Sequence, residues 1–314
     1  MTQPVSTREK VLSPESIEPG KIHKRHVSGD AVLKYFIYIP ENRSTYTSQF
    51  VSVHGISRNA REHAELFAPL AEQYGVVLVA PVFSKRHFGD YQRLGREGGG
   101  RRADHALQMI TEEIEYLTGA VSSKIFLTGF SGGGQFAHRY TMAYPERVQR
   151  LAICAAGWYT CPDESRRFPF GIVPTPRLKG VDFDMQKFLC VPTAVFVGQW
   201  DIMHDPGLNR SARIQQQQGF TRLERGRRWV AAMNRVAMEH DIDASCRFTI
   251  IPGVGHDFRR AMKNGQLGLR VFRYLFSIST NRHFTNGTCL ASDRHRLESD
   301  RIPMNPELAT GLFS

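Results

Sequence analysis

Short apolar runs alternate with amphipathic stretches along most of the chain. The apolar runs are rich in β-branched residues, and they cover residues 31–39, 50–54, 76–81, 124–128, 150–155, 192–198 and 248–252. Continuous apolar runs of this length are typical of strands that are buried on both faces. The stretches between them, such as 103–117 and 222–240, repeat apolar residues at helical spacing. We therefore predict an α/β fold in which helices cover both faces of a mostly parallel central sheet.

A length of 314 residues without an internal repeat fits one large domain. We place this domain at residues 31–278, after a polar N-terminal segment at 1–30. The remaining residues, 279–314, are rich in Asn, Arg, Asp and Pro and have weak periodicity. Such a composition buries little apolar surface, so we expect a loosely packed or partly disordered tail.

One turn carries a candidate nucleophile. Gly129-Phe130-Ser131-Gly132-Gly133 lies between the apolar run 124–128 and a helical stretch at 135–144. In this setting a G-x-S-x-G turn is a nucleophile elbow, where the serine takes a strained conformation and the glycines let strand and helix approach closely. The hydroxyl then lies at the helix N-terminus, where backbone N–H groups favour an oxyanion. We predict that Ser131 is the nucleophile; the alternative is a glycine-rich turn with an incidental serine.

A serine nucleophile needs a histidine as base and a carboxylate that fixes the imidazole tautomer. With this elbow, the chain order is serine, acid, histidine. Asp201 lies just past the end of the apolar run 192–198 and is the predicted acid. Asp205 is the rival, since a bend in the loop would bring it to the same place. Either aspartate could instead serve as a helix cap.

The predicted base is His256, on the loop between the apolar run 248–252 and a helix that we expect to continue to about residue 276. Of the 12 histidines, it combines the required order with a strand-to-helix loop. His204 is the alternative base. Three others lie in helical patterns, where we expect solvated faces: His63, His105 and His138.

The oxyanion hole should combine the N–H after the nucleophile, from Gly132, with one from an early strand-to-helix loop. A His54-Gly55 pair ends the apolar run 50–54, and the backbone N–H of Ile56 is the predicted second donor. We interpret the His54 ring as shaping this loop by hydrogen bonding rather than transferring protons. The residues expected to line the substrate pocket are His54, Gly55, Phe130, Trp158, Tyr159 and Trp200.

These motifs resemble the α/β-hydrolase superfamily, and within it the esterase and polyhydroxyalkanoate-depolymerase-like branch related to dienelactone hydrolases. The resemblance extends over about residues 32–276, and is carried by His54-Gly55, the elbow, Ala155-Ala156-Gly157, and the segments 198–201 and 253–256. It implies a serine carboxylic-ester hydrolase that needs no cofactor. Peptidases and acyltransferases use the same triad, so they stay as alternatives, as does a non-catalytic binding protein with this fold.

The segment at 157–190, between two predicted strands, is rich in Pro and aromatic residues. In this architecture, insertions at that place lie above the elbow and commonly form a cap over the substrate pocket. We therefore expect a small cap insertion, with Trp158 and Tyr159 in the pocket because they follow the strand end most closely. The alternative is a surface excursion without substrate contact.

The net charge of +11 is compatible with a nucleic-acid or anionic partner. However, no nucleic-acid motif accompanies it, and the arginine-rich run 222–228 alternates as a solvated helix face would. The first 18 residues lack the apolar core of a signal peptide, and the five cysteines contain no C-x-x-C pair. We expect a cytoplasmic protein with reduced thiols, no metal and no membrane or nucleic-acid partner, acting on a small or oligomeric ester.

Overall fold

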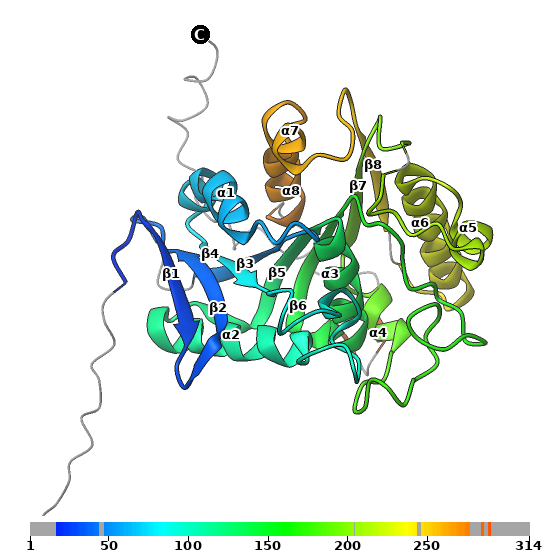
Figure 1. Cartoon of the computed structure of the whole chain (residues 1–314), viewed down its shortest axis with the longest axis horizontal. Coiled ribbons are helices and arrows are strands. Elements are labelled where there is room, and N and C mark those ends of the chain that lie inside the picture. The colour runs from blue at the N-terminus through cyan, green and yellow to red at the C-terminus, as the bar shows by residue number, and fades with distance from the viewer. Residues whose placement is uncertain are drawn as a thin grey trace, which may run out of the picture.

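The computed structural model describes residues 17–43, 47–203, 205–243, 246–276, 284–285 and 288–289. Eight strands form one sheet in the order β1-β2-β4-β3-β5-β6-β7-β8 (Figure 1). β2 runs antiparallel to both of its neighbours, β1 and β4, and all other adjacent strands in this sheet are parallel. The strands are β1 (Ile22–Val27), β2 (Asp30–Tyr38), β3 (Ser48–Val53), β4 (Val77–Val82), β5 (Val121–Phe130), β6 (Val148–Cys154), β7 (Thr193–Gly198) and β8 (Arg247–Ile251). The mostly parallel sheet predicted from the apolar runs is confirmed.

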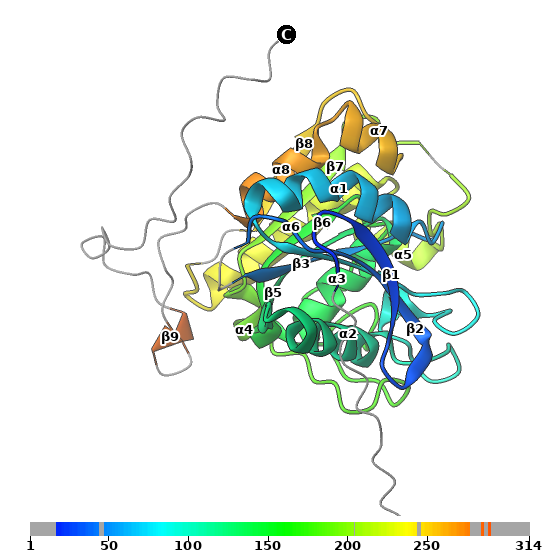
Figure 2. The ribbon, with the colours of Figure 1, turned by 90° about the vertical axis from the view of Figure 1, so that its left-hand side faces the viewer.

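Helices cover both faces of the sheet, as Figure 2 shows for α1 and α8 on one side and α2 on the other. Two apolar clusters fill the two interfaces, one containing Leu107, Phe136 and Trp229 and the other Phe67 and Phe272. The helices are α1 (Ala60–Tyr74), α2 (Ala103–Thr118), α3 (Gly132–Ala143), α4 (Met185–Leu189), α5 (Ala212–Gln218), α6 (Arg222–Glu239), α7 (Phe258–Lys263) and α8 (Leu267–Leu275). Because strand residues face alternately into these two clusters, the strands read as continuous apolar runs.

The sheet starts earlier than the domain boundary at residue 31 implies. β1 pairs with β2 from Ile22 opposite Tyr38 to His26 opposite Lys34, and it forms the edge of the sheet. Its sequence, IHKRHV, is largely polar. An edge strand needs few apolar positions, and charged side chains there discourage pairing with other chains. For this reason the apolar pattern does not reveal β1.

The helix expected to run to about residue 276 is two helices. α7 ends at Lys263 and α8 begins at Leu267, after Gln266 with a φ of 52°. A Cβ atom on Gly265 would lie 2.6 Å from Ile251 Cγ2, so a glycine is required where this break packs against β8.

Predictions for residues 1–16 and for most of the tail at 279–314 lie outside the described residues. Within that tail, β9 (Phe284–Thr285) pairs with β10 (Thr288–Cys289). None of the helices in the described ranges combines the length and apolar character needed to cross a membrane.

Candidate active site

Ser131 lies on the sharp turn between β5 and α3, with backbone angles of φ 54° and ψ −112°. Residues other than glycine rarely adopt a positive φ, so the backbone of this serine is strained. A Cβ atom on Gly129 would lie 2.2 Å from the Gly133 carbonyl oxygen, and one on Gly133 would lie 1.9 Å from the Val53 carbonyl oxygen. Both glycines are therefore required for the strands and α3 to approach each other at the elbow.

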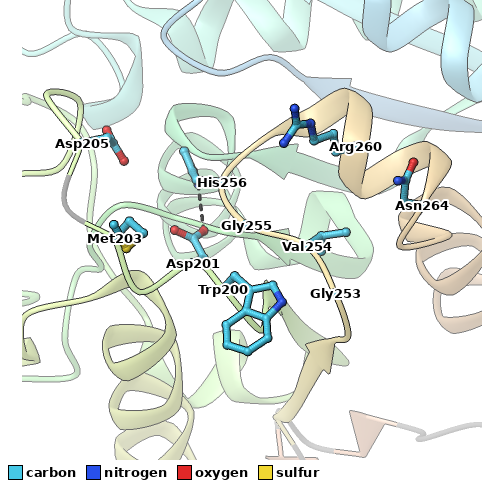
Figure 3. Close-up of a pocket in the computed structure, with 10 residues that line it drawn as sticks. All are labelled: Trp200, Asp201, Met203, Asp205, Gly253, Val254, Gly255, His256, Arg260 and Asn264. Carbon is cyan, nitrogen blue, oxygen red and sulfur yellow. Dashed lines mark hydrogen bonds and ion pairs between the residues drawn. The ribbon is translucent and has the colours of Figure 1, made fainter.

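His256 joins Ser131 to Asp201. Its Nε2 atom is 2.9 Å from Ser131 Oγ, and its Nδ1 atom is 2.8 Å from Asp201 Oδ2 (Figure 3 draws the second contact). The Asp201 carboxylate has no exposed surface, whereas the His256 side chain is 21% exposed. A buried carboxylate that accepts from Nδ1–H leaves Nε2 able to accept the serine proton. The structure thus brings the three predicted residues into one hydrogen-bonded series.

Asp205 takes a different position from Asp201. Its carboxylate contacts the guanidinium of Arg222, which also lies 3.3 Å from Asp201 Oδ1. Partial burial raises the pKa of Asp205, but the hydrogen bond and charge of Arg222 outweigh this effect and hold the pKa below its usual value. Asp201, not Asp205, is therefore the carboxylate hydrogen-bonded to His256. The alternative base, His204, lies outside the described residues.

The arginines at the start of α6 correct our interpretation of a solvated face. Arg222 and Arg225 are buried, whereas Arg227 and Arg228 are exposed. Arg225 donates hydrogen bonds to three backbone carbonyl oxygens, those of Gly157, Asn209 and Gly219. Positions 222, 225 and 229 share one helix face, and the burial of all three shows that this face points inward.

The two residues predicted to form the oxyanion hole lie next to Ser131. A Cβ atom on Gly132 would lie 3.2 Å from Ile56 Cγ2, and one on Gly55 would lie 3.5 Å from Ser131 Cβ. Gly132 is the first residue of α3, so its N–H has no partner within the helix. The loop after β3 and the start of α3 therefore meet at Ser131.

His54 shapes the loop after β3. The Phe83 N–H donates to His54 Nε2 over 3.0 Å, and His54 Nδ1 donates to the Gly55 carbonyl oxygen over 2.8 Å. Burial lowers the pKa of His54 to about 4, and the ring has no exposed surface. Because both ring nitrogens are bonded to backbone, the side chain does not reach a substrate. This corrects its place among the pocket residues, while its interpretation as a loop-shaping ring agrees with these contacts.

Trp158 and Tyr159 are buried rather than in the pocket. The Trp158 ring is 5% exposed and lies under the Arg139 guanidinium, and Tyr159 is stacked on Trp229 with ring centroids 5.0 Å apart. These aromatic side chains anchor the segment after β6 to α3 and α6. Among the described residues of 157–190, none lines the cavity beside His256. The pocket role expected for both residues is corrected, because the sequence does not show which way they point.

Phe130 is also buried, and its ring is stacked on His256 with centroids 5.2 Å apart. It supports the imidazole from behind instead of lining the pocket. Two further histidines differ from expectation: His63 is buried against Phe258, and His138 lies in the core between Gly134 and Thr160. Burial lowers the pKa of both rings well below the usual value. His105 is exposed, as expected.

A cavity of about 720 Å³ opens beside His256. Its walls come from the loops after β7 and β8 and from α7, as Figure 3 shows. Trp200 lines this cavity and is 54% exposed. Met203 and Arg260 also line it, and no sequence signal had indicated them. In the described part of the chain, no cluster of His, Cys, Asp and Glu side chains is suited to hold a metal ion.

No family model matches the chain. Among curated proteins, a probable acetylxylan esterase A of Aspergillus terreus is 32% identical over 123 residues. The match covers 35% of this chain and 39% of that relative, so the aligned stretch is well under two thirds of the relative's length.

Solved structures resemble the chain over a longer stretch. Poly(aspartic acid) hydrolase-1 from Sphingomonas sp. KT-1 aligns over 82% of this chain and 99% of its own, with a TM-score of 0.70 and 24% identity. A poly(3-hydroxybutyrate) depolymerase from Bordetella parapertussis aligns over 80% of this chain and 94% of its own, with a TM-score of 0.64 and 22% identity. The chain has the α/β-hydrolase fold, and the fold class predicted from the sequence is confirmed.

Proposed function

We propose that this chain is a serine hydrolase that cleaves carboxylic esters through an acyl-enzyme. The observation that carries the proposal is the hydrogen-bonded series Asp201, His256 and Ser131, with the serine strained at an elbow. The curated relative with a partial match is named as an esterase, which agrees with this reaction. A non-catalytic protein with this fold would have no need to keep the three side chains aligned.

In the proposed mechanism, His256 removes the proton of Ser131 as the oxygen attacks the ester carbonyl. Asp201 holds the imidazole in the required tautomer and stabilises the imidazolium. The N–H groups of Gly132 and Ile56 hold the oxyanion, each contributing about 3 kcal/mol to the transition state. His256 then gives its proton to the leaving alcohol, and a water molecule repeats the cycle on the acyl-enzyme.

The surface around the site favours a substrate with an apolar part. Nine large apolar side chains are exposed in the described ranges, and four of them lie on the loops after β3 and β7. These four are Ile56, Trp200, Ile202 and Met203. The same loops also carry Gly55, which lies beside Ser131, and Asp201. We therefore propose that an apolar acyl or alcohol group of the substrate packs against these four side chains.

Replacing the nucleophile tests the proposed function. Ser131→Ala should lower the turnover of an activated ester by about 10⁴-fold or more, because the covalent route is lost. A fluorophosphonate probe should label the wild-type protein and the control variant Ser165→Ala, but not Ser131→Ala. Labelling of another serine, or full turnover by Ser131→Ala, would contradict the proposal.

The class of acyl substrate is a separate question, since peptidases and acyltransferases use the same triad. A panel of matched esters, amides and lactones addresses it. We expect the esters to be cleaved fastest; a preference for amides would favour a peptidase, and transfer to an added alcohol in preference to water would favour an acyltransferase.

We also propose a cytoplasmic location. Cys154 and Cys246 are present as thiols, and burial raises the pKa of Cys154 to about 12, which keeps it protonated and unreactive. Fractionation of source cells, with ester turnover measured in each fraction, tests this proposal.

A further inference from the structure

Arg222 is a buried cation in direct contact with the candidate triad acid. It is the first residue of α6, and its side chain is 2% exposed. Its Nη1 atom lies 3.3 Å from Asp201 Oδ1, while the other oxygen of Asp201 accepts from His256. The same Nη1 atom contacts Asp205 Oδ2. One guanidinium therefore bridges the two carboxylates of the loop after β7.

Backbone N–H groups donate to both aspartates, to the backbone of Asp201 and to the carboxylate of Asp205. The Leu223 N–H of α6 donates to the Asp201 carbonyl oxygen over 3.4 Å. The Gly207 N–H donates to Asp205 Oδ1 over 2.8 Å, which leaves Oδ2 for Arg222. The start of α6 thus holds the loop after β7 through its backbone and through one side chain. A loop held in this way keeps Asp201 at a fixed distance from the imidazole.

Arg222 and Asp205 also place one positive and one negative charge near the His256 imidazole, on the side of Asp201. The positive charge of Arg222 opposes formation of the His256 imidazolium, and the negative charge of Asp205 favours it. Three other ionisable groups lie near these residues. Arg225 is next to Arg222, Tyr159 is near Asp201, and Arg260 of α7 lines the same cavity. Tyr159 stays neutral because burial raises its pKa far above the usual value. None of the three contacts His256 or Asp201 through a hydrogen bond in the described structure.

We propose that Arg222 and Asp205 are positioning residues. Arg222 holds the Asp201 carboxylate at hydrogen-bonding distance from His256, and the negative charge of Asp205 offsets the positive charge of Arg222. This inference rests on the proposed function, because it assigns Asp201 and His256 to the triad. It also explains why an arginine is present here. A neutral side chain of similar size would fill the space, but it would not bridge two carboxylates.

The two charges predict opposite changes in pH dependence. Arg222→Gln removes a positive charge, so the acid limb of the kcat/KM profile should move to higher pH. Asp205→Asn removes a negative charge, so the same limb should move to lower pH. Each shift should be about half a pH unit, the effect of one charge several Å away at a solvent-like dielectric constant. In the double variant, Arg222→Gln with Asp205→Asn, the limb should return close to its wild-type position.

Loss of loop structure alone cannot give this result. It would lower kcat in both single variants, by about tenfold, without moving the acid limb in opposite directions. Arg228→Gln is the matched control, since Arg228 lies on the outer face of α6 and pairs with Glu224. Arg222→Lys should keep the limb in place, because an ammonium keeps the positive charge beside the two carboxylates.

The proposal is overturned if Asp205→Asn leaves the acid limb unmoved or moves it to higher pH. This variant carries the test even if Arg222→Gln fails to fold, because Asp205 is partly exposed. Fluorophosphonate labelling of Ser131 in each variant separates the two proposals. Without labelling of the wild-type serine, the proposed function fails; with labelling but limbs that shift together or not at all, only the role of Arg222 and Asp205 fails.

Discussion

Two regions flank Ser131, and they are built in different ways. The loop after β3, which carries Ile56, is held by hydrogen bonds to backbone and not by ion pairs among the described residues. The buried His54 ring bonds to backbone on both sides, and Tyr91 Oη donates to the His54 carbonyl oxygen over 3.0 Å. Arg58, on the same loop, donates to the Phe83 carbonyl oxygen. The loops after β7 and β8 instead contain charged groups that contact each other, and His256 there is partly open to solvent. We call these regions the oxyanion side and the acid–base side.

The difference follows from what each region has to do in the proposed reaction. Oxyanion donors act best when they are already fixed at the correct distance, in surroundings with little water. Hydrogen bonds to backbone give that rigidity without a buried ion pair, which is costly to remove from water. A general base has to gain and lose a proton in each cycle, so it needs access to solvent and a nearby carboxylate. The comparison thus predicts large charge effects on one side and small packing effects on the other.

The largest effect should come from the acid–base side, where the two aspartates are compared directly. Asp201→Asn keeps the shape of the side chain but presents the wrong hydrogen-bonding partner to Nδ1, so kcat near neutral pH should fall by about 10⁴-fold. Asp205→Asn removes a contact with Arg222 only, and should cost tenfold at most. Steady-state turnover of an activated ester measures both.

A reversal of these two results would make Asp205 the working acid in solution. Two small effects would mean that His256 is oriented by another group. Melting temperatures of both variants show whether a loss of turnover comes from chemistry or from unfolding.

Much of the acid–base side could be predicted from the sequence. Asp201 and His256 follow apolar strands at the carboxyl edge of a parallel sheet, and chain order and loop type are local properties that the sequence shows. Arg222 could not be recognised in the same way. Its burial depends on the face that α6 turns toward the sheet, and arginines at such spacing are usually solvated.

The pocket residues show the same limit. Trp200 and Trp158 each follow a strand closely, yet Trp200 is exposed in the cavity and Trp158 is covered by Arg139. The direction of the Trp158 ring is decided by the packing of the segment after β6 against α3 and α6. The edge strand β1 cannot be recognised from the sequence, because its largely polar residues show no pattern of apolar positions. Strands and turns are local; side-chain direction is set by tertiary contacts.

The oxyanion side should limit stability at low pH. The pKa of His54 is lowered to about 4 by burial, from 6.5 for the free side chain. Between these values the unfolded chain binds a proton that the folded chain does not, so stability is complete above about pH 6.5 and falls as the pH drops toward 4. For His54 alone the loss should reach about 3 kcal/mol. His63 and His138 act in the same direction.

Urea unfolding between pH 4 and pH 7 measures this dependence. His105→Gln is the control, because His105 is exposed and its removal should leave the curve unchanged. A free energy of unfolding that stays constant across this range would contradict the prediction that burial lowers the pKa of these histidine rings.

The smallest effect should come from Tyr91→Phe, which removes one hydroxyl from the oxyanion side. Its Oη is buried and donates to the His54 carbonyl oxygen, so the change leaves that oxygen without this partner at a cost of about 1 kcal/mol. The ring should stay in place because it packs under the Arg58 guanidinium, 4.2 Å from the ring centroid. The loop that carries Ile56 then loosens, and kcat should fall by about tenfold with little change in KM, because the oxyanion forms only after binding. Tyr140→Phe, another buried tyrosine, should lower stability without changing kcat. If both variants lower kcat equally, the hydroxyl of Tyr91 acts through general stability, and the oxyanion side does not depend on this hydrogen bond.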